Sequence, residues 1–391
     1  MSEWKECTIG DLGKIITGKT PRTAITKNYG GKVPFLSPSD NMELKHIDKT
    51  NKTLTDQGVE EVKNCLLPAN AVCVSCIGSD LGKVLITTQP SVTNQQINSI
   101  IVNEDNDTDF IYYLMTIVGK QLNFISKTST AVPIINKTTF SNYKISVPSL
   151  PEQRKIAELL SSLDEKIETN HKINARLEEL AQALFKSWFI DFEPFGGKMP
   201  EDWEIKSLSS IATYLNGLAM QKYPPINSGD KLPVLKIKEL GDGYINVNSD
   251  FCSETNIGSD YVIESGDIVF SWSGTLLVKM WTGGKCGLNQ HLFKVTSDQY
   301  PKWFYYFWTL HHNENFKRIA KDKAVTMGHI KREELDKAKV NIPSSEFINR
   351  ADAVLSPILR QIENTSIESS RLAALRDALL PKLMSGELIP E

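Results

Sequence analysis

A glycine-containing string near the N-terminus matches the pattern of a phosphate-binding loop. Residues 13–20 read GKIITGKT, two glycines five positions apart followed by Lys and Thr. Such a loop binds phosphate where it runs into a helix whose N-terminal N–H groups face the anion. Here Pro21 and Arg22 follow at once, and the stretch up to Gly31 is rich in turn residues. We therefore expect no nucleotide site at this position.

A second candidate for chemistry is the pair Cys73 and Cys76, which has the Cys-x-x-Cys spacing of zinc and redox sites. The sequence holds no second pair at a suitable spacing. The apolar run 71–74 around the first thiol instead predicts a buried strand. We expect both cysteines to be small core residues, with no metal bound.

Other catalytic patterns are missing from the sequence. The six histidines form no His-x-x-x-His pair, and no nucleophile elbow or Asn/Asp-Pro-Pro-Tyr/Phe loop of amino-methyltransferases is present. These absences favour a binding protein over an ATPase or a methyltransferase. An enzyme would need a phosphate loop in its proper context or a methyl-donor pocket.

Composition predicts a globular protein of two or three domains, with 391 residues, 40% hydrophobic and 23% charged. No run of about 18 apolar residues could span a membrane, and the first residues lack the basic and apolar regions of a signal peptide. We therefore expect a cytoplasmic protein whose six cysteines are reduced.

The charge is nearly balanced, with 44 basic and 47 acidic residues and a net charge of −3. This argues against a surface that is uniformly basic for nucleic acid, but it allows local patches. Residues 302–339 hold nine basic residues against five acidic ones, and residues 109–144 hold four against one. Both stretches also contain aromatic residues, most of which we expect in the core because of their helical spacing.

The most informative feature is an internal repeat with a period close to half the chain. At an offset of 199, four residues of the first half match four of the second: Trp4, Ile9, Leu12 and Gly18 match Trp203, Leu208, Ile211 and Gly217. Further along, residues 94–95 match 289–290 at an offset of 195. Small drifts of this kind are expected at loops of two diverged copies of one fold.

Each copy ends in a sequence typical of one long helix with a heptad seam. The seam predicts helix pairing through Ile156, Leu160, Leu163, Ile167, Leu177 and Leu184 in the first copy and Leu355, Ile358, Ile362, Leu372 and Leu379 in the second. Matched polar residues interrupt both seams, Asn170 and Asn174 in one and Thr365 and Ser369 in the other. We expect the two helices to pair with each other in antiparallel fashion, which would put the domains at opposite ends. The alternative is that each helix packs on its own domain.

The predicted fold class is α+β, with two similar mixed α/β domains, two long antiparallel coiled-coil helices and a pseudo-twofold repeat. The predicted boundaries are 1–150 for the first globular domain and 151–192 for the long central helix. The second globular domain is expected at 193–343, and the C-terminal helix at 344–391.

Residues 148–157 (PSLPEQRKIA) and 163–167 (LDEKI) resemble the helical region of Type I restriction-modification specificity subunits. Residues 185–195 (FKSWFIDFEPF) and 379–387 (LLPKLMSGE) do so as well. The similarity covers essentially the whole chain, whereas the globular domains match only in outline. The second helix departs from the pattern, because residues 343–347 read PSSEF where Pro-Glu-Gln-Arg would stand.

The resemblance implies a non-catalytic subunit that reads double-stranded DNA, each globular domain being a target recognition domain for one half of a bipartite site. It implies two modification (methyltransferase) subunits as partners, and two restriction (translocase/nuclease) subunits in the full complex. S-adenosylmethionine, ATP and Mg²⁺ would belong to these partners, and this chain would carry no cofactor.

On this basis we predict DNA contacts by basic residues at phosphates and by polar residues at base edges. In the first domain these are Lys19, Arg22, Lys27, Lys32, Gln95, Gln96 and Lys137, and in the second Lys236, Lys238, Asn289, Gln290, His291, Lys323 and Lys331. For each lysine, simple solvation at the surface is the alternative.

Helix length suggests a ruler between the two half-sites. Roughly 38 helical residues at about 1.5 Å each span about 57 Å, which is about one to one and a half turns of duplex DNA. The competing hypothesis is a coiled-coil scaffold or adaptor that needs only the helices. Matched polar residues in loops of both copies favour the DNA-reading protein.

Overall fold

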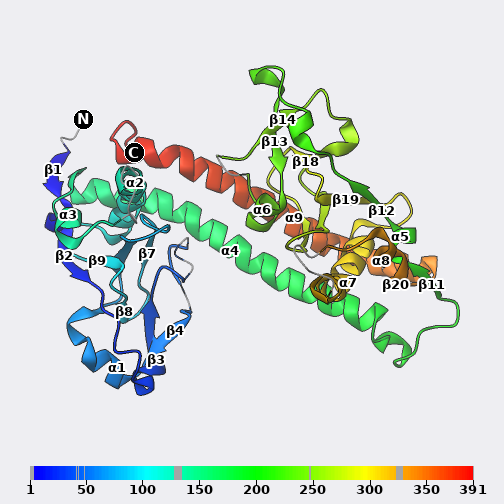
Figure 1. Cartoon of the computed structure of the whole chain (residues 1–391), viewed down its shortest axis with the longest axis horizontal. Helices are drawn as coiled ribbons and strands as arrows, with labels where there is room; N and C mark the ends of the chain where they lie inside the picture. The colour runs from blue at the N-terminus through cyan, green and yellow to red at the C-terminus, as the bar shows by residue number, and fades with distance from the viewer. Residues whose placement is uncertain are drawn as a thin grey trace. The chain divides into compact units, whose positions relative to one another are not determined.

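The computed structural model describes residues 4–40, 42, 44–47, 49–126, 134–245, 248–322 and 329–390. The chain divides into two compact units, one formed by residues 1–164 with 375–391 and the other by residues 165–374. Figure 1 shows the elements of each. No helix in the described part of the chain is long and apolar enough to cross a membrane.

Unit 1 contains two four-stranded sheets and a two-stranded one. The first has the antiparallel order β2-β9-β6-β7, with bounds Gly13–Thr17, Ile97–Val102, Ala71–Ser75 and Val84–Ile86. The second has the order β4-β3-β8-β5, with bounds Lys52–Leu54, Tyr29–Leu36, Ser91–Thr93 and Leu66–Leu67, and β3 runs parallel to β8. Strands β1 (Lys5–Thr8) and β10 (Lys144–Val147) pair antiparallel. Helix α2 (Thr108–Ser126) packs on β6 and β7.

Unit 2 repeats these sheets strand for strand. One sheet has the order β12-β19-β16-β17, with bounds Thr213–Asn216, Leu292–Thr296, Ile268–Ser271 and Val278–Met280. The other has the order β14-β13-β18-β15, with bounds Phe251–Ser253, Lys231–Leu235, Cys286–Leu288 and Val262–Ile263. Strands β11 (Glu204–Ser207) and β20 (Lys339–Ile342) pair as β1 and β10 do. The predicted α+β fold and its internal repeat are therefore confirmed.

Helices also correspond between the units. Helix α7 (Lys302–Asp322) is the counterpart of α2, and α8 (Arg332–Lys337) is that of α3 (Lys137–Ser141). Smaller helices are α1 (Asp56–Glu61), α5 (Leu208–Ile211), α6 (Ile237–Asp242) and the 3-10 turns η1 (Ile9–Leu12), η2 (Thr26–Asn28), η3 (Lys63–Cys65), η4 (Glu193–Phe195), η5 (Met220–Lys222), η6 (Ser228–Asp230) and η7 (Ser259–Tyr261). The aromatic run 303–308 on α7 is buried in the core of unit 2, as its helical spacing predicts.

The two long helices are α4 (Leu150–Phe189) and α9 (Ser345–Met384), each of 40 residues. Within unit 2 they run antiparallel, because Asn170 Nδ2 donates to Glu368 Oε2 at 2.8 Å while Asn174 Nδ2 donates to Ser366 Oγ at 2.8 Å. Thr365 donates its hydroxyl hydrogen to the Asn174 side chain. The predicted polar layer thus fixes the register of the pair by hydrogen bonds.

In unit 1, α4 and α9 are joined by an ion pair. Arg376 Nη1 donates to Asp164 Oδ1 at 2.6 Å, and the other oxygen of this carboxylate accepts a hydrogen bond of 2.5 Å from the Tyr113 hydroxyl on α2. Lys45 Nζ reaches Asp109 at 2.8 Å and Ser161 Oγ at 2.9 Å. These bonds attach the first globular domain to the helical segments of its own unit.

Burial along the helices differs from the predicted seam. Ile156 and Leu160 lie in the core of unit 1, and Leu355 and Ile362 are buried in unit 2. Seven predicted seam residues are only partly buried, namely Leu163, Ile167, Leu177, Leu184, Ile358, Leu372 and Leu379.

At the C-terminal end of α4, the fully buried positions are Ala181, Phe185 and Phe189 instead. The reason is the neighbouring helix α7, since the Phe185 ring lies 5.6 Å from Phe307 and 5.1 Å from Trp308 between centroids. At this end α4 therefore packs on the second globular domain, which follows it in the chain and is not the domain of its own copy of the repeat. This contact does not correspond to the alternative in which each helix packs on its own domain.

The two helix starts are anchored differently. At the start of α4, the buried Gln153 accepts from Asp107 N at 2.9 Å and donates to Asn106 Oδ1 at 3.0 Å. Near the start of α9, Phe347 packs on Trp203 and Phe189 with centroid distances of 5.4 and 5.7 Å. The sequence departure at residues 343–347 thus replaces a polar anchor by an aromatic one.

Candidate nucleic-acid interface

Four chain segments meet at one edge of the first domain, which we call edge 1: residues 18–20, 76–78, 94–96 and 134–137. Backbone hydrogen bonds join each segment to its spatial neighbour. Lys19 N donates to Thr93 O at 2.9 Å, Cys76 N to Gln96 O at 2.7 Å and Ile135 N to Cys76 O at 2.9 Å. The segments follow β2 and β6 and precede β9 and α3. Loops that far apart in the sequence thus present one continuous surface.

The second domain builds the same arrangement, edge 2, from residues 216–218, 272–274, 289–291 and 329–331. Leu218 N donates to Leu288 O at 2.9 Å, Trp272 N to His291 O at 3.4 Å and Ile330 N to Trp272 O at 3.1 Å. These bonds reproduce those of edge 1 between matching positions of the repeat. The framework is therefore common to both domains.

One glycine in each edge permits this close approach. A Cβ on Gly18 would lie 2.2 Å from the Asn94 carbonyl oxygen, and one on Gly217 would lie 2.3 Å from that of Asn289. Both neighbours are backbone atoms, which a side-chain rotation cannot move away. The match of these glycines in the sequence repeat therefore has a steric cause.

Asn94 and Asn289 are the buried members of segments 94–96 and 289–291, each 8% exposed. The Asn94 side-chain oxygen accepts from Gln96 N at 3.1 Å, and that of Asn289 accepts from His291 N at 3.3 Å. A side chain used in this way holds a turn. The structure therefore places the predicted reader Asn289 as a positioning residue of the turn.

The next two positions carry the accessible side chains. Gln95 is exposed and Gln96 is partly buried in edge 1, whereas Gln290 is partly buried and His291 is exposed in edge 2. Gln95 accepts a hydrogen bond from Thr20 Oγ1 at 2.7 Å, and Gln96 accepts one from Asn94 Nδ2 at 2.8 Å. Edge 1 thus presents amides whose oxygens are already oriented.

Edge 2 carries rings where edge 1 carries amides. The Trp272 ring lies 6.0 Å from His291 and 6.5 Å from His329 between centroids, and its Nε1 donates to Asn216 Oδ1 at 2.9 Å. Ser273 Oγ and His291 Nδ1 are 3.0 Å apart in a hydrogen bond. Sequence reasoning missed Trp272, Ser273 and His329 as site residues. The equivalent backbone bonds of the two edges show that Trp272 takes the position of Cys76.

The predicted basic residues divide into two groups. Lys19 and Lys137 are exposed in edge 1, and Lys331 is exposed in edge 2. These three cations belong to the same loop segments as the accessible amide and imidazole groups.

The others lie elsewhere or have acidic partners. Arg22 Nε is 2.9 Å from Glu61 Oε1, and its backbone N–H donates to the same oxygen, which holds the pKa of Glu61 below its usual range. Lys236 is ion-paired with Asp250. Lys27 precedes β3, Lys32 lies within β3 and Lys238 lies on α6. Lys323 falls outside the described residues.

The Gly-Lys-Thr string and the Cys-x-x-Cys pair both lie at strands of the first domain. Residues 13–17 are strand β2, paired with β9 along its whole length, so no helix N-terminus follows the Gly-Lys-Thr string. Burial raises the pKa of Cys73 to about 12 and that of Cys76 to about 11, which keeps both thiols protonated. No metal-binding cluster of His, Cys, Asp and Glu is found among the described residues.

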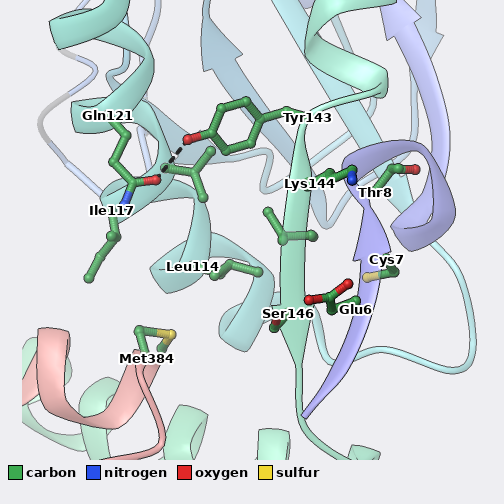
Figure 2. A pocket seen from close by; sticks show the side chains of 12 residues that line it. Glu6, Cys7, Thr8, Leu114, Ile117, Gln121, Tyr143, Lys144, Ser146 and Met384 are labelled. Atoms are coloured by element: carbon green, nitrogen blue, oxygen red, sulfur yellow. Dashed lines mark hydrogen bonds between the residues drawn. The ribbon is translucent and has the colours of Figure 1, made fainter.

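A cavity of about 500 Å³ in unit 1 lies between β1, β10, α2 and Met384, as Figure 2 shows. The Tyr143 hydroxyl donates to Gln121 Oε1 at 3.0 Å across one side of it. Its lining includes no histidine and none of the predicted DNA contacts, and burial raises the pKa of its thiol, Cys7. The cavity therefore lacks an activated nucleophile and lies apart from edge 1.

Taken together, two copies of one loop framework with accessible polar tips define a repeated recognition protein. Residues 1–179 and 200–376 both match the family model of the Type I restriction modification DNA specificity domain. The chain therefore belongs to the Type I restriction-modification DNA specificity family.

Individual relatives cover nearly the whole chain. It is 29% identical to the Type I restriction enzyme MjaIX specificity subunit of Methanocaldococcus jannaschii, over 99% of this chain and 94% of that protein. It is 24% identical to the HindI specificity subunit of Haemophilus influenzae, over 99% and 100%. The crystal structure of a Type I S subunit from M. genitalium shares the fold, with a TM-score of 0.59, 16% identity and coverage of 100% of this chain and 97% of that one.

Proposed function

We propose that edges 1 and 2 are the surfaces with which this specificity subunit reads the two halves of a bipartite DNA site. The observation that carries the proposal is the recurrence of one backbone framework with different accessible side chains. A constant scaffold with variable tips suits two domains that bind the same duplex and read different sequences. Phosphate contacts by Lys19, Lys137 and Lys331 would position the domains, and the tips would contact base edges.

The chemistry of modification and cleavage would belong to partner subunits. S-adenosylmethionine, ATP and Mg²⁺ would bind there, and this chain would act as a non-catalytic subunit. Supporting this, the candidate nucleotide loop is a paired strand and the Cys-x-x-Cys thiols are buried. Together with the partner subunits, the chain would work in the cytoplasm.

The long helices offer a docking surface for modification subunits. Leu177, Leu180 and Leu184 form a stripe on α4 at steps of three and four, and Leu180 is 48% exposed. An equivalent stripe stands at the same offset on α9, formed by Leu372, Leu375 and Leu379, with Leu375 also 48% exposed. In each row the middle leucine is exposed and the two that flank it are partly buried. An exposed apolar side chain in such a row is typical of a helix-binding surface.

Two equivalent stripes would bind two copies of one partner, and this favours two modification subunits for each specificity subunit. Two restriction subunits would complete the full assembly. A simple scaffold without readout would use the same helices. The repeated edges, whose exposed tips differ between the copies, favour the DNA-reading role.

The test is co-expression with a Type I modification subunit from the same genome, followed by sequencing of the methylated bases in host DNA. The proposal predicts a two-part motif with a fixed gap. Exchange of residues 1–150 for those of another family member should change one half only, and exchange of residues 193–343 should change the other. Methylation that is independent of this chain, or unchanged by both exchanges, would leave the scaffold role as the better account.

A further inference from the structure

One tryptophan contacts every other segment of edge 2. The Trp272 ring lies 6.0 Å from the His291 ring and 6.5 Å from the His329 ring between centroids. Its Nε1 donates to Asn216 Oδ1 at 2.9 Å. The backbone of Trp272 adds two bonds, since its N–H donates to His291 O and its carbonyl oxygen accepts from Ile330 N. Trp272 therefore links the side chains of all four segments.

The Trp272 ring also rests on the core of the second domain. The Phe293 ring lies 5.8 Å from it between centroids, and Phe293 is 4% exposed. Trp272 itself is partly buried. Because the indole is packed on one face and hydrogen-bonded through its nitrogen, its N–H has a fixed direction.

Two contacts of opposite type fix the orientation of the Asn216 amide. An indole N–H can only donate a hydrogen bond, so the atom of Asn216 that faces Trp272 must be the oxygen. The Asn216 nitrogen donates to the carbonyl oxygen of Gly217 at 3.1 Å. An amide nitrogen carries two hydrogens, and the second one has no partner among the described residues. Asn216 is only partly buried, so this N–H is left for a ligand.

Edge 1 is built differently at these two positions. The repeat places Thr17 at the position of Asn216, at an offset of 199, and Cys76 at the position of Trp272. Thr17 Oγ1 donates to Asn98 Oδ1 at 2.6 Å, whereas Cys76 is 2% exposed and donates its thiol to a main-chain carbonyl oxygen. The pair of Asn216 and Trp272 therefore distinguishes edge 2 from edge 1.

We propose that Asn216 is a specificity-determining residue of the second half-site and that Trp272 is the positioning residue that makes its amide a donor. Because the indole holds the oxygen, Asn216 offers an N–H to the DNA. A neutral amide in a fixed orientation suits a base edge, whereas Lys331 of the same edge has the charge for a phosphate. The proposal rests on the proposed function of edge 2.

The orientation of the amide determines the kind of base atom it can bind. In the major groove the acceptors are N7 and O6 of guanine, N7 of adenine and O4 of thymine, whereas the amino groups of cytosine and adenine donate. A donor therefore favours an acceptor at the base-pair position that Asn216 reaches, and it disfavours the cytosine amino group.

Removal of the indole N–H should relax this preference. Trp272→Phe keeps an aromatic ring but frees the Asn216 amide to turn over and present either its oxygen or its nitrogen. Discrimination between acceptor and donor bases at one base-pair position should then fall about fivefold. Asn216→Ala removes the contact and should relax the same position at least as much. Because Trp272 acts through Asn216, the double variant should have the same preference as Asn216→Ala.

The experiment uses the complex of the full chain with its modification subunit and S-adenosylmethionine. The substrate is a duplex library that keeps the first half of the methylated motif constant and randomises the second half. Sequencing of the methylated duplexes gives the base preference at each position for the wild type, both single variants and the double variant. Thermal melting of each complex measures stability separately from base preference.

Trp281→Phe is the matched control in the same domain. The Trp281 indole also donates a hydrogen bond, to Gly284 O at 2.6 Å, but it lies outside edge 2. Trp281→Phe should leave the base preference unchanged at every position, whatever its effect on the melting temperature.

Several results would overturn the proposal. They are an unaltered preference in Asn216→Ala or in Trp272→Phe, relaxation at different positions in these two variants, and a double variant relaxed at more positions than Asn216→Ala. A change in Trp272→Phe that Trp281→Phe reproduces would assign the indole a purely structural role and would also overturn it. Failure of the proposed function itself would appear separately, as methylation that does not change when residues 193–343 are exchanged.

Discussion

Edges 1 and 2 have the same backbone and different surfaces. In both, a glycine approaches a carbonyl oxygen closely, a buried asparagine holds the turn at 94–96 or 289–291, and strand order is identical. The accessible groups are amides in edge 1 and an imidazole beside an indole in edge 2. The glycine and the asparagine therefore build the loop framework of each edge, whereas the accessible side chains are free to vary.

The largest effect should come from the framework glycines. Gly18→Ala or Gly217→Ala places a Cβ about 2.2–2.3 Å from a backbone oxygen, so the edge must open, and the free energy of unfolding should fall by about 2–4 kcal/mol. Thermal melting measures the loss, and methylome sequencing should show that the affected half-site is no longer read.

Gly258→Ala is the matched control for the second domain. Its added Cβ would meet only the Tyr261 ring, at 3.7 Å, without a backbone clash. Its stability should stay within about 0.5 kcal/mol of wild type. Equal losses in Gly258→Ala and Gly217→Ala would show that the close approach at edge 2 has no special role.

A smaller and symmetric effect is expected from the turn asparagines. Asn94→Ala and Asn289→Ala each remove a side-chain acceptor from a buried turn, which should cost about 1–2 kcal/mol in either unit. Chemical denaturation of both variants measures this. A loss in one variant and none in the other would mean that the two frameworks are not equivalent.

Both units contain carboxylates whose pKa lies below the ordinary range. In unit 1, Glu61 accepts from Arg22 and Asn28, and Asp11 accepts from Thr8. In unit 2, hydrogen bonds from the Ser253 side chain, Ile226 N and Thr255 lower the pKa of Asp230. A lowered folded-state pKa means stability that is present above the unfolded-state pKa and is lost as pH falls through the folded-state value.

Melting temperature should therefore decline as the pH drops below about 4. Asp230→Asn should flatten the decline for unit 2, and Glu61→Gln should flatten it for unit 1. Asp260→Asn, in the exposed turn η7, serves as a control and should leave the pH profile unchanged. If neither carboxylate variant alters the profile, these hydrogen bonds do not contribute to acid stability.

Much of this architecture was predictable because it depends on local pattern. The offset of 199 between Gly18 and Gly217 reflects a shared steric need, and the asparagines at 170 and 174 mark the polar layer of the helix pair. Aromatic spacing predicted the buried face of α7. The family similarity of residues 148–157 includes Gln153, whose buried side chain joins α4 to the start of α2.

The sequence could not predict features that depend on contacts between residues far apart in the chain. The heptad pattern predicted Leu184 in the seam, but the rings of α7 draw Phe185 inward instead. Asn289 was predicted at a base edge because of its type, and only the fold shows it buried under the turn. Trp272 belongs to edge 2 through a long-range backbone contact to the segment at 289–291.

The accessible side chains of each edge, such as Gln95 and Gln290, should determine which bases its domain prefers. The glycines and asparagines behind them should determine only the shape of the loops. The most direct measurement is methylome sequencing of cells that express the full complex with Gln95→Ala or Gln290→Ala. The account predicts that each variant folds with wild-type stability and relaxes or alters base preference only in the half read by its own domain. A variant that changes both halves, or an unaltered motif in both variants, would contradict it.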